Sequence, residues 1–333
     1  MATMAEVARL AGVSIATVSH VLNGTRAVRP ETRAIVLDAV RAADYTPNTV
    51  AQSLATARTT TIGLALSAIS NPFLGELLAA VEAEAARQGY TLLVADPHED
   101  PEYEATVLRR LHGRRVDGVL FAPSASPGPT LDFLAARGVP TVLVDRLIDP
   151  ARDQVGTENV EAVAGLVAHL AGTGHERIAL VAGQAGLRTT IERVEGYRLG
   201  LQRAGLAAAP GLLVDGHSAE EPARVAVHAL LAAAHPPTAV ITANNSMTIG
   251  AMQAFREAGV EVPRDMALAA FDDFPWADLF HPRLTVVAQP FAEIGREAVR
   301  LLLRRMADPS AAPVTTRLSP RFVHRESCGC EAS

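Results

Sequence analysis

From Ile62 onward the chain alternates short apolar runs with longer amphipathic stretches, and this alternation constrains the fold more than any other feature. Runs without polar alternation are typical of strands buried on both faces, as in parallel sheets covered by helices. The sequence therefore predicts an α/β body of doubly wound parallel sheets. The runs are TIGLALS, YTLLVAD, DGVLFAP, PTVLVD, RIALVAG, GLLVDG, TAVITAN and MALAAFDD.

The alternation of strands and helices occurs in two similar halves, and the second half begins near Val160. Two doubly wound halves leave a cleft between them, and the carboxyl ends of their parallel strands point into it. We therefore expect a ligand-binding site in that cleft.

The first sixty residues have a different pattern, that of short helices. Thr3 and Glu6 form a capping box for a helix that ends at Gly12. Ser14 is a good N-cap for a second helix, which ends at Asn23 and Gly24. Two short helices joined by a glycine turn predict a helix-turn-helix.

The second helix has one apolar face and one small polar face. At about 100° per residue, Val18, Val21 and Leu22 share the inner face. The outer face has no carboxylate, so it can enter a DNA major groove without repelling phosphates. A solvated amphipathic helix is the alternative, but such faces usually carry Glu, Lys or Arg. The outer face consists of Ala16, Ser19, His20 and Asn23, flanked by Ile15 and Thr17.

A third helix is predicted over RPETRAIVLDAVRAADY, with Pro30 in its first turn and Val36, Leu37 and Val40 facing inward. Pro47 then interrupts the chain, and a short helix runs to about residue 57. A helix this short is marginal in water, so the body, a second copy or DNA must order it.

These segments resemble a known family. AEVARLAGVSIATVSHVLNG followed by YTPNTVAQSLATART is similar to the DNA-binding head and hinge of the lactose/galactose repressor family of transcription regulators. The resemblance implies that the second helix reads the major groove. It also implies that the hinge helices of a dimer pair in the minor groove, where Leu54 would wedge between base pairs beside Ala51.

By the same resemblance, Ile15, Ala16 and His20 occupy base-reading positions. Thr17, Ser19 and Asn23 mainly position the DNA backbone. Ile15 and Ala16 offer no side-chain hydrogen bond, so readout there should depend on apolar contact, for example with thymine methyl groups. The complete predicted DNA-binding set is Thr3, Ser14, Ile15, Ala16, Thr17, Ser19, His20, Asn23, Ala51 and Leu54.

The resemblance continues through the body, in segments such as HLAGTGHERIALVAG and PTAVITANNSMTIGAM. It implies two subdomains like those of periplasmic sugar-binding proteins, together with a set of effector contacts. Guanidinium, carboxylate and amide groups suit the hydroxyls of a polyol, and an aromatic ring can cover its apolar face. The predicted effector-binding set is Phe73, Leu74, Asp145, Arg193, Asn244, Asp272 and Trp276.

Structural alternatives stay open for several of these residues. Arg193 and Glu192 could form an exposed helical ion pair. Asp272, next to Asp273, could belong to a strand-end turn, and Phe73 could be core packing. Arg146 is equally compatible with a surface ion pair and with a ligand contact.

Metal and catalytic chemistry find little support in the sequence. The two cysteines, Cys328 and Cys330, lie in an SCGC segment that could bind metal with a partner's copy, but two thiols make an incomplete site. We therefore predict no metal, no cofactor other than the small effector, and no enzymatic activity. The histidines considered are scattered without metal-ligand spacing: His169, His175, His217, His228 and His235.

The predicted organisation is a helix-turn-helix domain over 1–46, a hinge helix and linker over 47–60, an effector-binding and dimerisation domain over 61–327, and a tail over 328–333. Its N-subdomain comprises about 61–159 and 290–318, and its C-subdomain about 160–289 and 319–327. Residues 1–60 carry six arginines against four carboxylates, whereas the whole chain has a net charge of −6. This asymmetry is consistent with an anionic partner bound at the N-terminal end.

The sequence thus predicts a cytoplasmic DNA-binding transcription regulator, a repressor that binds a near-palindromic operator as a homodimer. A small ligand would control its affinity; a sugar is favoured, and a nucleoside or a sugar acid remains an alternative. We find no signal peptide or membrane span in the sequence. A solute-binding receptor without DNA function shares the predicted body and is the main alternative. An enzyme on an α/β scaffold would need a catalytic cluster, which the sequence does not offer.

Overall fold

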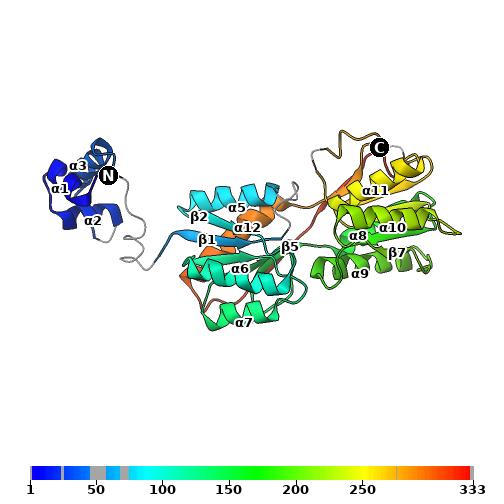
Figure 1. Cartoon of the computed structure of the whole chain (residues 1–333), viewed down its shortest axis with the longest axis horizontal. Coiled ribbons are helices and arrows are strands. Elements are labelled where there is room, and N and C mark those ends of the chain that lie inside the picture. Colours follow the sequence, from blue (N-terminus) through cyan, green and yellow to red (C-terminus); the bar gives the residue numbers. More distant parts are fainter. Residues whose placement is uncertain (1, 24–25, 46–57, 68–74, 275, 331–333) are drawn as a thin grey trace. The chain divides into compact units, whose positions relative to one another are not determined.

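The computed structural model describes residues 2–23, 26–45, 58–67, 75–274 and 276–330. The chain divides into two compact units (Figure 1). One comprises Met1–Thr61 with Arg115–Asp117, and the other comprises Ile62–Arg114 with Gly118–Ser333. We describe each unit by itself.

The N-terminal unit is a small helical domain. Helix α1 (Met4–Ala11) begins at the N-cap Thr3 and ends at Gly12, whose φ of 64° is left-handed. The described part of this unit also contains helix α2 (Ile15–Asn23) and helix α3 (Pro30–Ala42). Its core is formed by Val7, Ala8, Ala11, Val18, Val21, Val36 and Ala39.

One detail of the α3 prediction is wrong. Val36 is buried and Val40 packs against the core, but Leu37 is 39% exposed. Leu37 lies about 100° around the helix from Val36, whereas Ala39 and Val40 lie on the two flanks of Val36. The small residue Ala39, and not Leu37, therefore completes the inner face.

The second unit contains two six-stranded sheets, which we call the first and second sheets. The order of the first is β11-β5-β4-β3-β1-β2, and that of the second is β12-β10-β9-β8-β6-β7. The strands of the first sheet are β1 (Thr61–Ala65), β2 (Thr91–Ala95), β3 (Gly118–Phe121), β4 (Thr141–Val144), β5 (Asp153–Thr157) and β11 (Thr315–Leu318). Those of the second are β6 (Ile178–Ala182), β7 (Leu213–Asp215), β8 (Ala239–Thr242), β9 (Ala267–Phe271), β10 (Thr285–Ala288) and β12 (Arg321–Val323).

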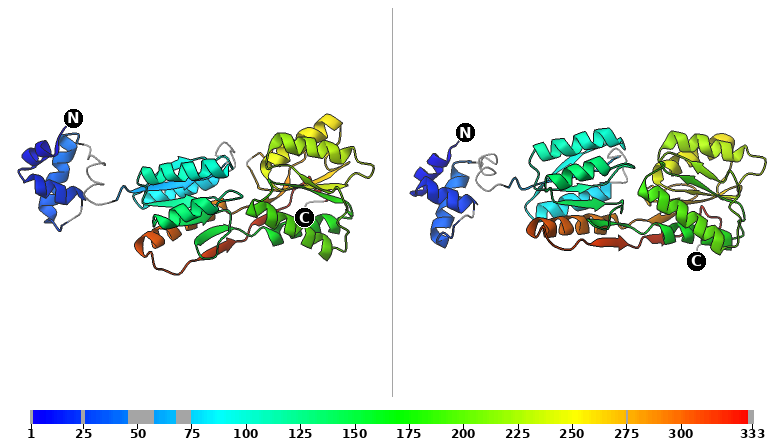
Figure 2. Two further views of the ribbon diagram at one scale, coloured as in Figure 1. Left: turned by 60° about the horizontal axis from the view of Figure 1, so that its bottom comes forward. Right: turned by 90° about the horizontal axis from the view of Figure 1, so that it is seen from below.

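Helices cover both sheets, as Figure 2 shows from two sides. Around the first sheet, α5 packs against α12 and α6 against α7. Around the second, α8 packs against α9 and α10 against α11. The bounds are α5 (Gly75–Arg87), α6 (Pro101–Gly113), α7 (Gly128–Ala136), α8 (Val160–Gly172), α9 (Arg188–Arg203), α10 (Glu220–Leu231), α11 (Asn245–Ala258) and α12 (Phe291–Ala307).

The chain passes between the two sheets after β5, after β10 and after β11. The predicted fold class, a helix-turn-helix domain with a two-part α/β body, is confirmed. The second sheet differs from the prediction in one respect, because β12 runs antiparallel to β10.

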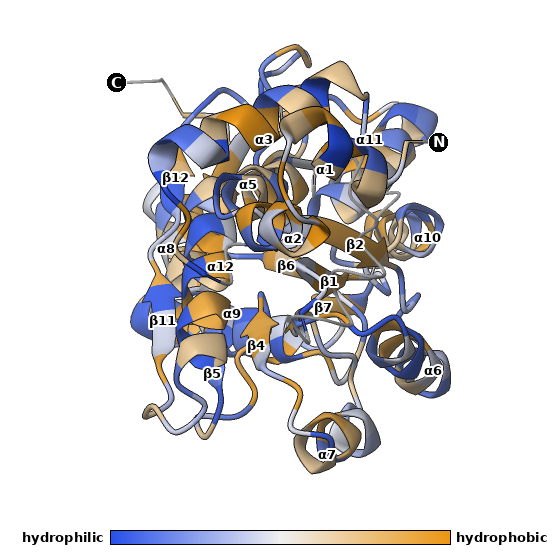
Figure 3. Ribbon diagram, turned by 90° about the vertical axis from the view of Figure 1, so that its left-hand side faces the viewer, coloured by the Kyte–Doolittle hydropathy of each residue, from blue (hydrophilic) through white to orange (hydrophobic). Residues whose placement is uncertain are grey.

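Four strands of the body were not among the predicted apolar runs: β5, β10, β11 and β12. Figure 3 contrasts two strands of the first sheet: β4, which was predicted, is mostly hydrophobic, and β11, which was not, is mostly hydrophilic. Strand β5 reads DQVGT, yet all its residues are buried. Asp153 is buried there because Arg304 and Arg305 pair with its carboxylate.

Close helix packing in the second unit depends on glycine. A Cβ at Gly196 in α9 would lie 2.3 Å from the carbonyl oxygen of Val160 in α8. That separation is far inside van der Waals contact, so only glycine fits between these backbones.

Among the described residues, no single helix is long and apolar enough to cross a membrane. Helices α1 and α2 reach the length and apolar composition of a membrane span only when they are counted together. The chain bends by 104° between them.

Candidate DNA-reading helix and ligand cavity

Helix α2 is held in place by its own cap and by the small core. The backbone N–H of Thr17 donates to Ser14 Oγ at 3.1 Å, and the hydroxyls of Ser14 and Thr17 lie 2.9 Å apart. At the start of α1, the N–H of Glu6 donates to Thr3 Oγ1 at 3.3 Å. Thr3 and Ser14 therefore stand at helix N-termini, where backbone N–H groups and the helix dipole favour anions such as phosphate.

The outer face of α2 has the composition expected from the sequence. Val18 and Val21 are buried, whereas Ile15 is 51% exposed and Ala16 is also exposed. Ser19, His20 and Asn23 are partly exposed, and the amide of Asn23 donates to Ser19 Oγ at 3.0 Å. The predicted hinge residues Ala51 and Leu54 lie outside the described residues.

A cavity of about 190 Å³ in the second unit is lined by residues from the first-sheet half and from the second-sheet half. Three of its polar lining residues stand at or just beyond the ends of parallel strands: Asp145 follows β4, Asp272 follows β9, and Asn244 lies two residues after β8. The carboxyl ends of parallel strands are where ligands of such sheets bind. Of the predicted effector set, Asp145, Arg193, Asn244 and Asp272 line this cavity.

Arg193 is buried, with only 7% of its surface exposed. Its Nε donates to Asn159 Oδ1 at 2.9 Å, its Nη1 donates to the carbonyl of Ala243 at 2.5 Å, and its guanidinium lies 3.8 Å from the centroid of Phe271. Burial lowers the pKa of Arg193, while the carboxylates of Asp272 and Asp145 oppose that shift. The alternative of an exposed ion pair with Glu192 is therefore excluded.

Two aspartates at the strand ends adopt left-handed backbone conformations, with φ of 68° at Asp145 and 79° at Asp272. Burial raises the pKa of Asp145, and the charges of Arg146 and Arg193 oppose this. Asp272 Oδ1 accepts a 2.5 Å hydrogen bond from Gln289 Nε2. Asp272 thus occupies a strand-end turn and also lines the cavity, so the two readings of this residue are compatible.

Asn244 caps helix α11. Its Oδ1 accepts from the N–H of Met247 at 2.8 Å, and its Nδ2 donates to the carbonyl of Ser218 at 3.2 Å. An amide has a second lone pair and a second N–H. Asn244 can therefore still contact a ligand, although capping sets its orientation.

Arg146, whose role the sequence left undecided, lines the cavity and is only 9% exposed. Its two terminal nitrogens bind Glu99 at 2.8 and 2.5 Å, and Nη1 also donates to the carbonyl of Pro123 at 2.7 Å. Among the described residues its buried Nε has no hydrogen-bond partner, and it lies 3.7 Å from Asp145 Oδ2. A buried donor of this kind is costly unless a ligand or water accepts from it.

The remaining predictions for the cavity differ in outcome. Trp276 is 50% exposed and is not among the residues that line the cavity. Phe73 and Leu74 lie outside the described residues. Sequence analysis missed Glu99, Gln289 and Phe291, which all contribute to the lining. Only their positions after a strand or at a crossover between the sheets could have indicated them.

The fold and the two sites define a class of protein: a DNA-reading helical domain combined with a ligand-binding α/β body. Residues 3–48 match the family model described as bacterial regulatory proteins, lacI family, and residues 167–328 match the periplasmic binding protein-like domain. The chain belongs to the LacI family of bacterial regulatory proteins, and it is a DNA-binding transcription regulator. The resemblance inferred from the sequence is confirmed.

Relatives match over nearly the whole chain. The chain is 34% identical to the HTH-type transcriptional repressor PurR of Mannheimia succiniciproducens and 35% identical to the ribose operon repressor of Haemophilus influenzae, with 98% of each chain covered in both cases. A structure of the lac repressor dimer bound to operator and an anti-inducer matches with a TM-score of 0.87 at 27% identity, covering 98% of this chain and 99% of that one. The complex of the regulator CelR with cellobiose matches with a TM-score of 0.75 at 31% identity, covering 98% and 100%.

Proposed function

We propose that this protein is a repressor that binds a near-palindromic operator as a homodimer and that a small polyol, of the sugar class, controls its operator affinity. The observation that carries the ligand part is the set of buried charges at the strand ends. Arg146 and Arg193 provide fork-shaped donors, and Asp145 and Asp272 provide acceptors in the same cavity. Adjacent hydroxyls of a sugar can satisfy both kinds of group at once.

The size and lining of the cavity support a small, polar ligand. Its volume of about 190 Å³ is below the roughly 300–1,000 Å³ of pockets for drug-sized ligands. Among the described lining residues, Phe291 is the one Phe, Tyr or Trp side chain. The guanidinium and carboxylate groups of this lining suit the hydroxyls of a monosaccharide. One solved relative, a LacI family regulator from Enterococcus faecium, carries bound ribose.

The ligand cavity is connected to the crossovers between the sheets. Gln289, at one crossover, donates to Asp272 and accepts from Thr157 Oγ1 at 2.5 Å, and Thr157 ends β5 next to another crossover. We propose that ligand binding at Asp272 changes the angle between the subdomains, about 61–159 with 290–318 and about 160–289 with 319–327. A change in this angle alters the spacing of the two hinges of a dimer and thereby operator affinity.

A second route joins the same elements through Glu192. This carboxylate is 2% exposed and binds Arg317 of β11 at 2.8 Å and Asn159 at 2.9 Å. Asn159 in turn accepts from Arg193 in the cavity. A ligand that contacts Arg193 therefore also perturbs the contact between α9 and β11.

For the DNA side, we propose that the outer face of α2 reads the major groove, with Ile15, Ala16 and His20 at base edges. The roles proposed for Ala51 and Leu54 in the minor groove rest on the family resemblance. The whole proposal is tested by selecting operators from random oligonucleotides with the full-length protein and by screening sugars for thermal stabilisation of it. A protein with no sequence preference, with or without sugars, would contradict the repressor function.

The change His20→Ala should weaken binding to the selected operator by about 1–2 kcal/mol, because it removes one partly exposed polar contact to a base edge. Discrimination at one base pair of each half-site should weaken with it. Fluorescence anisotropy against single-base operator variants measures both effects. The matched control is His228→Ala in α10, which should leave operator affinity unchanged; equal losses in both variants would argue against groove reading by His20.

Operator binding should also weaken with salt. Each phosphate neutralised by the protein contributes about −0.9 to the slope of log K against log salt concentration. Anisotropy titrations over a series of salt concentrations give the slope directly. A flat dependence would show that phosphate contacts do not contribute to binding.

A further inference from the structure

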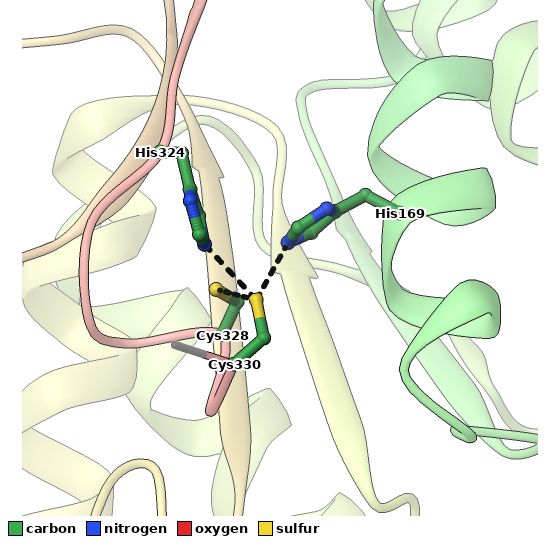
Figure 4. A group of neighbouring side chains, drawn as sticks. All are labelled: His169, His324, Cys328 and Cys330. Carbon is green, nitrogen blue, oxygen red and sulfur yellow. Dashed lines mark hydrogen bonds between the residues drawn. The ribbon is translucent and has the colours of Figure 1, made fainter. Parts of the chain in front are cut away.

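Four side chains with metal-ligating atoms meet at one edge of the second sheet, as Figure 4 shows. One comes from α8, one follows β12, and two come from the turn after it. Their ligand atoms all lie within 4.8 Å of one another. We call this group the His/Cys cluster; it consists of His169, His324, Cys328 and Cys330.

The distances within the His/Cys cluster approach those of a tetrahedral metal site. Cys330 Sγ lies 2.9 Å from His324 Nε2, 3.4 Å from His169 Nε2 and 3.0 Å from Cys328 Sγ. With Zn–S bonds of about 2.3 Å and Zn–N bonds of about 2.0–2.1 Å, neighbouring ligand atoms of a tetrahedron are about 3.3–3.8 Å apart. These three separations are within 1 Å of the tetrahedral values, and the other pairs of ligand atoms, which lie within 4.8 Å of one another, would have to close to them.

The backbone that carries the thiols is anchored independently of them. Ser327 Oγ accepts from the N–H of Thr285 at 2.8 Å and donates to the carbonyl of Leu268 at 2.6 Å. Cys328 is fully buried, and Thr285 Oγ1 donates to its Sγ at 3.3 Å. These contacts place the Cys328 thiol without help from a ligand.

Gly329 brings the second thiol back toward the first. Its φ of 82° lies in the left-handed region, where side-chain-bearing residues are strained. The N–H of Gly329 donates to the carbonyl of Glu326 at 3.0 Å, which closes a turn. The Cys-Gly-Cys segment is therefore shaped so that Cys328 and Cys330 face the same point.

An aromatic ring packs beside both imidazoles. The centroid of Phe322 lies 5.0 Å from that of His169 and 6.1 Å from that of His324, and the latter pair is stacked. The two imidazoles also contact each other edge to face, at 5.2 Å. This packing restricts both rings and covers one side of the cluster.

The His/Cys cluster is distant in the topology from the ligand cavity. Because β12 is antiparallel to β10 and Val323 pairs with Val286, the residues after Val323 continue toward the amino end of β10. The ligand cavity lies at the carboxyl ends of the parallel strands. The two sites therefore lie at opposite ends of the strands of the second sheet.

We propose that the His/Cys cluster binds one Zn²⁺ in a tetrahedral site with two thiolate and two imidazole ligands. Thiolates with imidazoles select Zn²⁺ over the oxygen-preferring Mg²⁺ and Ca²⁺. Four protein ligands leave no open position for a substrate, so the site is structural. It ties the C-terminal segment and β12 to α8, and binding releases the two thiol protons to solvent.

Metal content provides the first test. The full-length protein is produced without a polyhistidine tag and purified under reducing conditions. It should contain about one zinc per chain, as measured by inductively coupled plasma mass spectrometry. After chelation, titration with Co²⁺ should give the thiolate-to-cobalt charge-transfer and d–d bands of a tetrahedral site, and Zn²⁺ should displace them. Protein that is metal-free and gives no such bands at one equivalent would overturn the proposal.

Two ligand variants provide the second test. Removing a group that only supports a metal ligand lowers metal affinity by roughly 10- to 100-fold. Cys330→Ser and His324→Gln remove a ligand itself, so each should lower Zn²⁺ affinity by more than that. The matched control is His228→Gln, whose imidazole lies 2.7 Å from Glu257 on the surface formed by α10 and α11; it should bind zinc as the native chain does. Undiminished zinc affinity in both ligand variants would refute the assignment.

The alternative to zinc binding is a disulfide bond between Cys328 and Cys330. An intact mass lower by two hydrogens in the freshly purified, metal-free protein would favour that outcome and refute the zinc site. If either variant fails to fold by circular dichroism, the cobalt spectrum of the native chain still decides between the two.

Discussion

Arg193→Ala is expected to abolish the response to the effector while operator binding persists. The side chain is 7% exposed and is positioned by Asn159 and Ala243 beside two carboxylates. Losing a hydrogen bond between a charged donor and the effector costs about 1.5–3 kcal/mol, which corresponds to roughly 10- to 150-fold in effector affinity. Calorimetry with the sugar found in the thermal screen measures this loss, and anisotropy measures operator binding.

The control for this substitution is Arg198→Ala, because Arg198 lies on the same helix but is exposed. It should leave both activities intact. Arg193→Lys keeps the charge but loses the planar fork, so its effector affinity should fall between those of the native chain and Arg193→Ala. An Arg193→Ala protein with a normal effector dose–response would remove this residue from the proposed site.

Gly196→Ala is expected to destabilise the body severely. The added methyl group would lie 2.3 Å from the carbonyl oxygen of Val160, and backbone atoms cannot rotate away as a side chain can. Overpacking typically costs about 1–3 kcal/mol. At the upper value, which the rigid backbone contact favours, the thermal midpoint should fall by about 6–12 °C. Thermal unfolding followed by circular dichroism measures the shift.

The same substitution at Gly165, in the facing helix α8, is the matched control. A Cβ there meets no atom within 4 Å, and the position is exposed. Gly165→Ala should therefore stabilise the protein by roughly 0.5–1 kcal/mol, because alanine favours the helix and lowers the entropy of the unfolded chain. Shifts of the same sign in both variants would contradict the proposed close approach of α8 and α9.

The candidate effector residues were predicted from the family resemblance, and three of them also stand where the sequence predicts strand ends. Asp145, Asp272 and Asn244 stand at or just beyond strand ends, and apolar runs indicate where such ends occur. The outer face of α2 follows from helical periodicity in the same way. Arg146 could not be assigned, because its role depends on Glu99, which lies 47 residues away.

The sequence by itself determined the helix-turn-helix, the apolar strands with their covering helices, and membership of the LacI family, since each depends on short-range periodicity or on long ordered matches. Only the tertiary structure decided the burial of the polar strand β5, the antiparallel pairing of β12, and the meeting of His169 with Cys330, which are 161 residues apart. The reason is physical: burial of a polar group depends on the partner that compensates its lost hydration. That partner is supplied by a distant part of the chain, and no local pattern contains it.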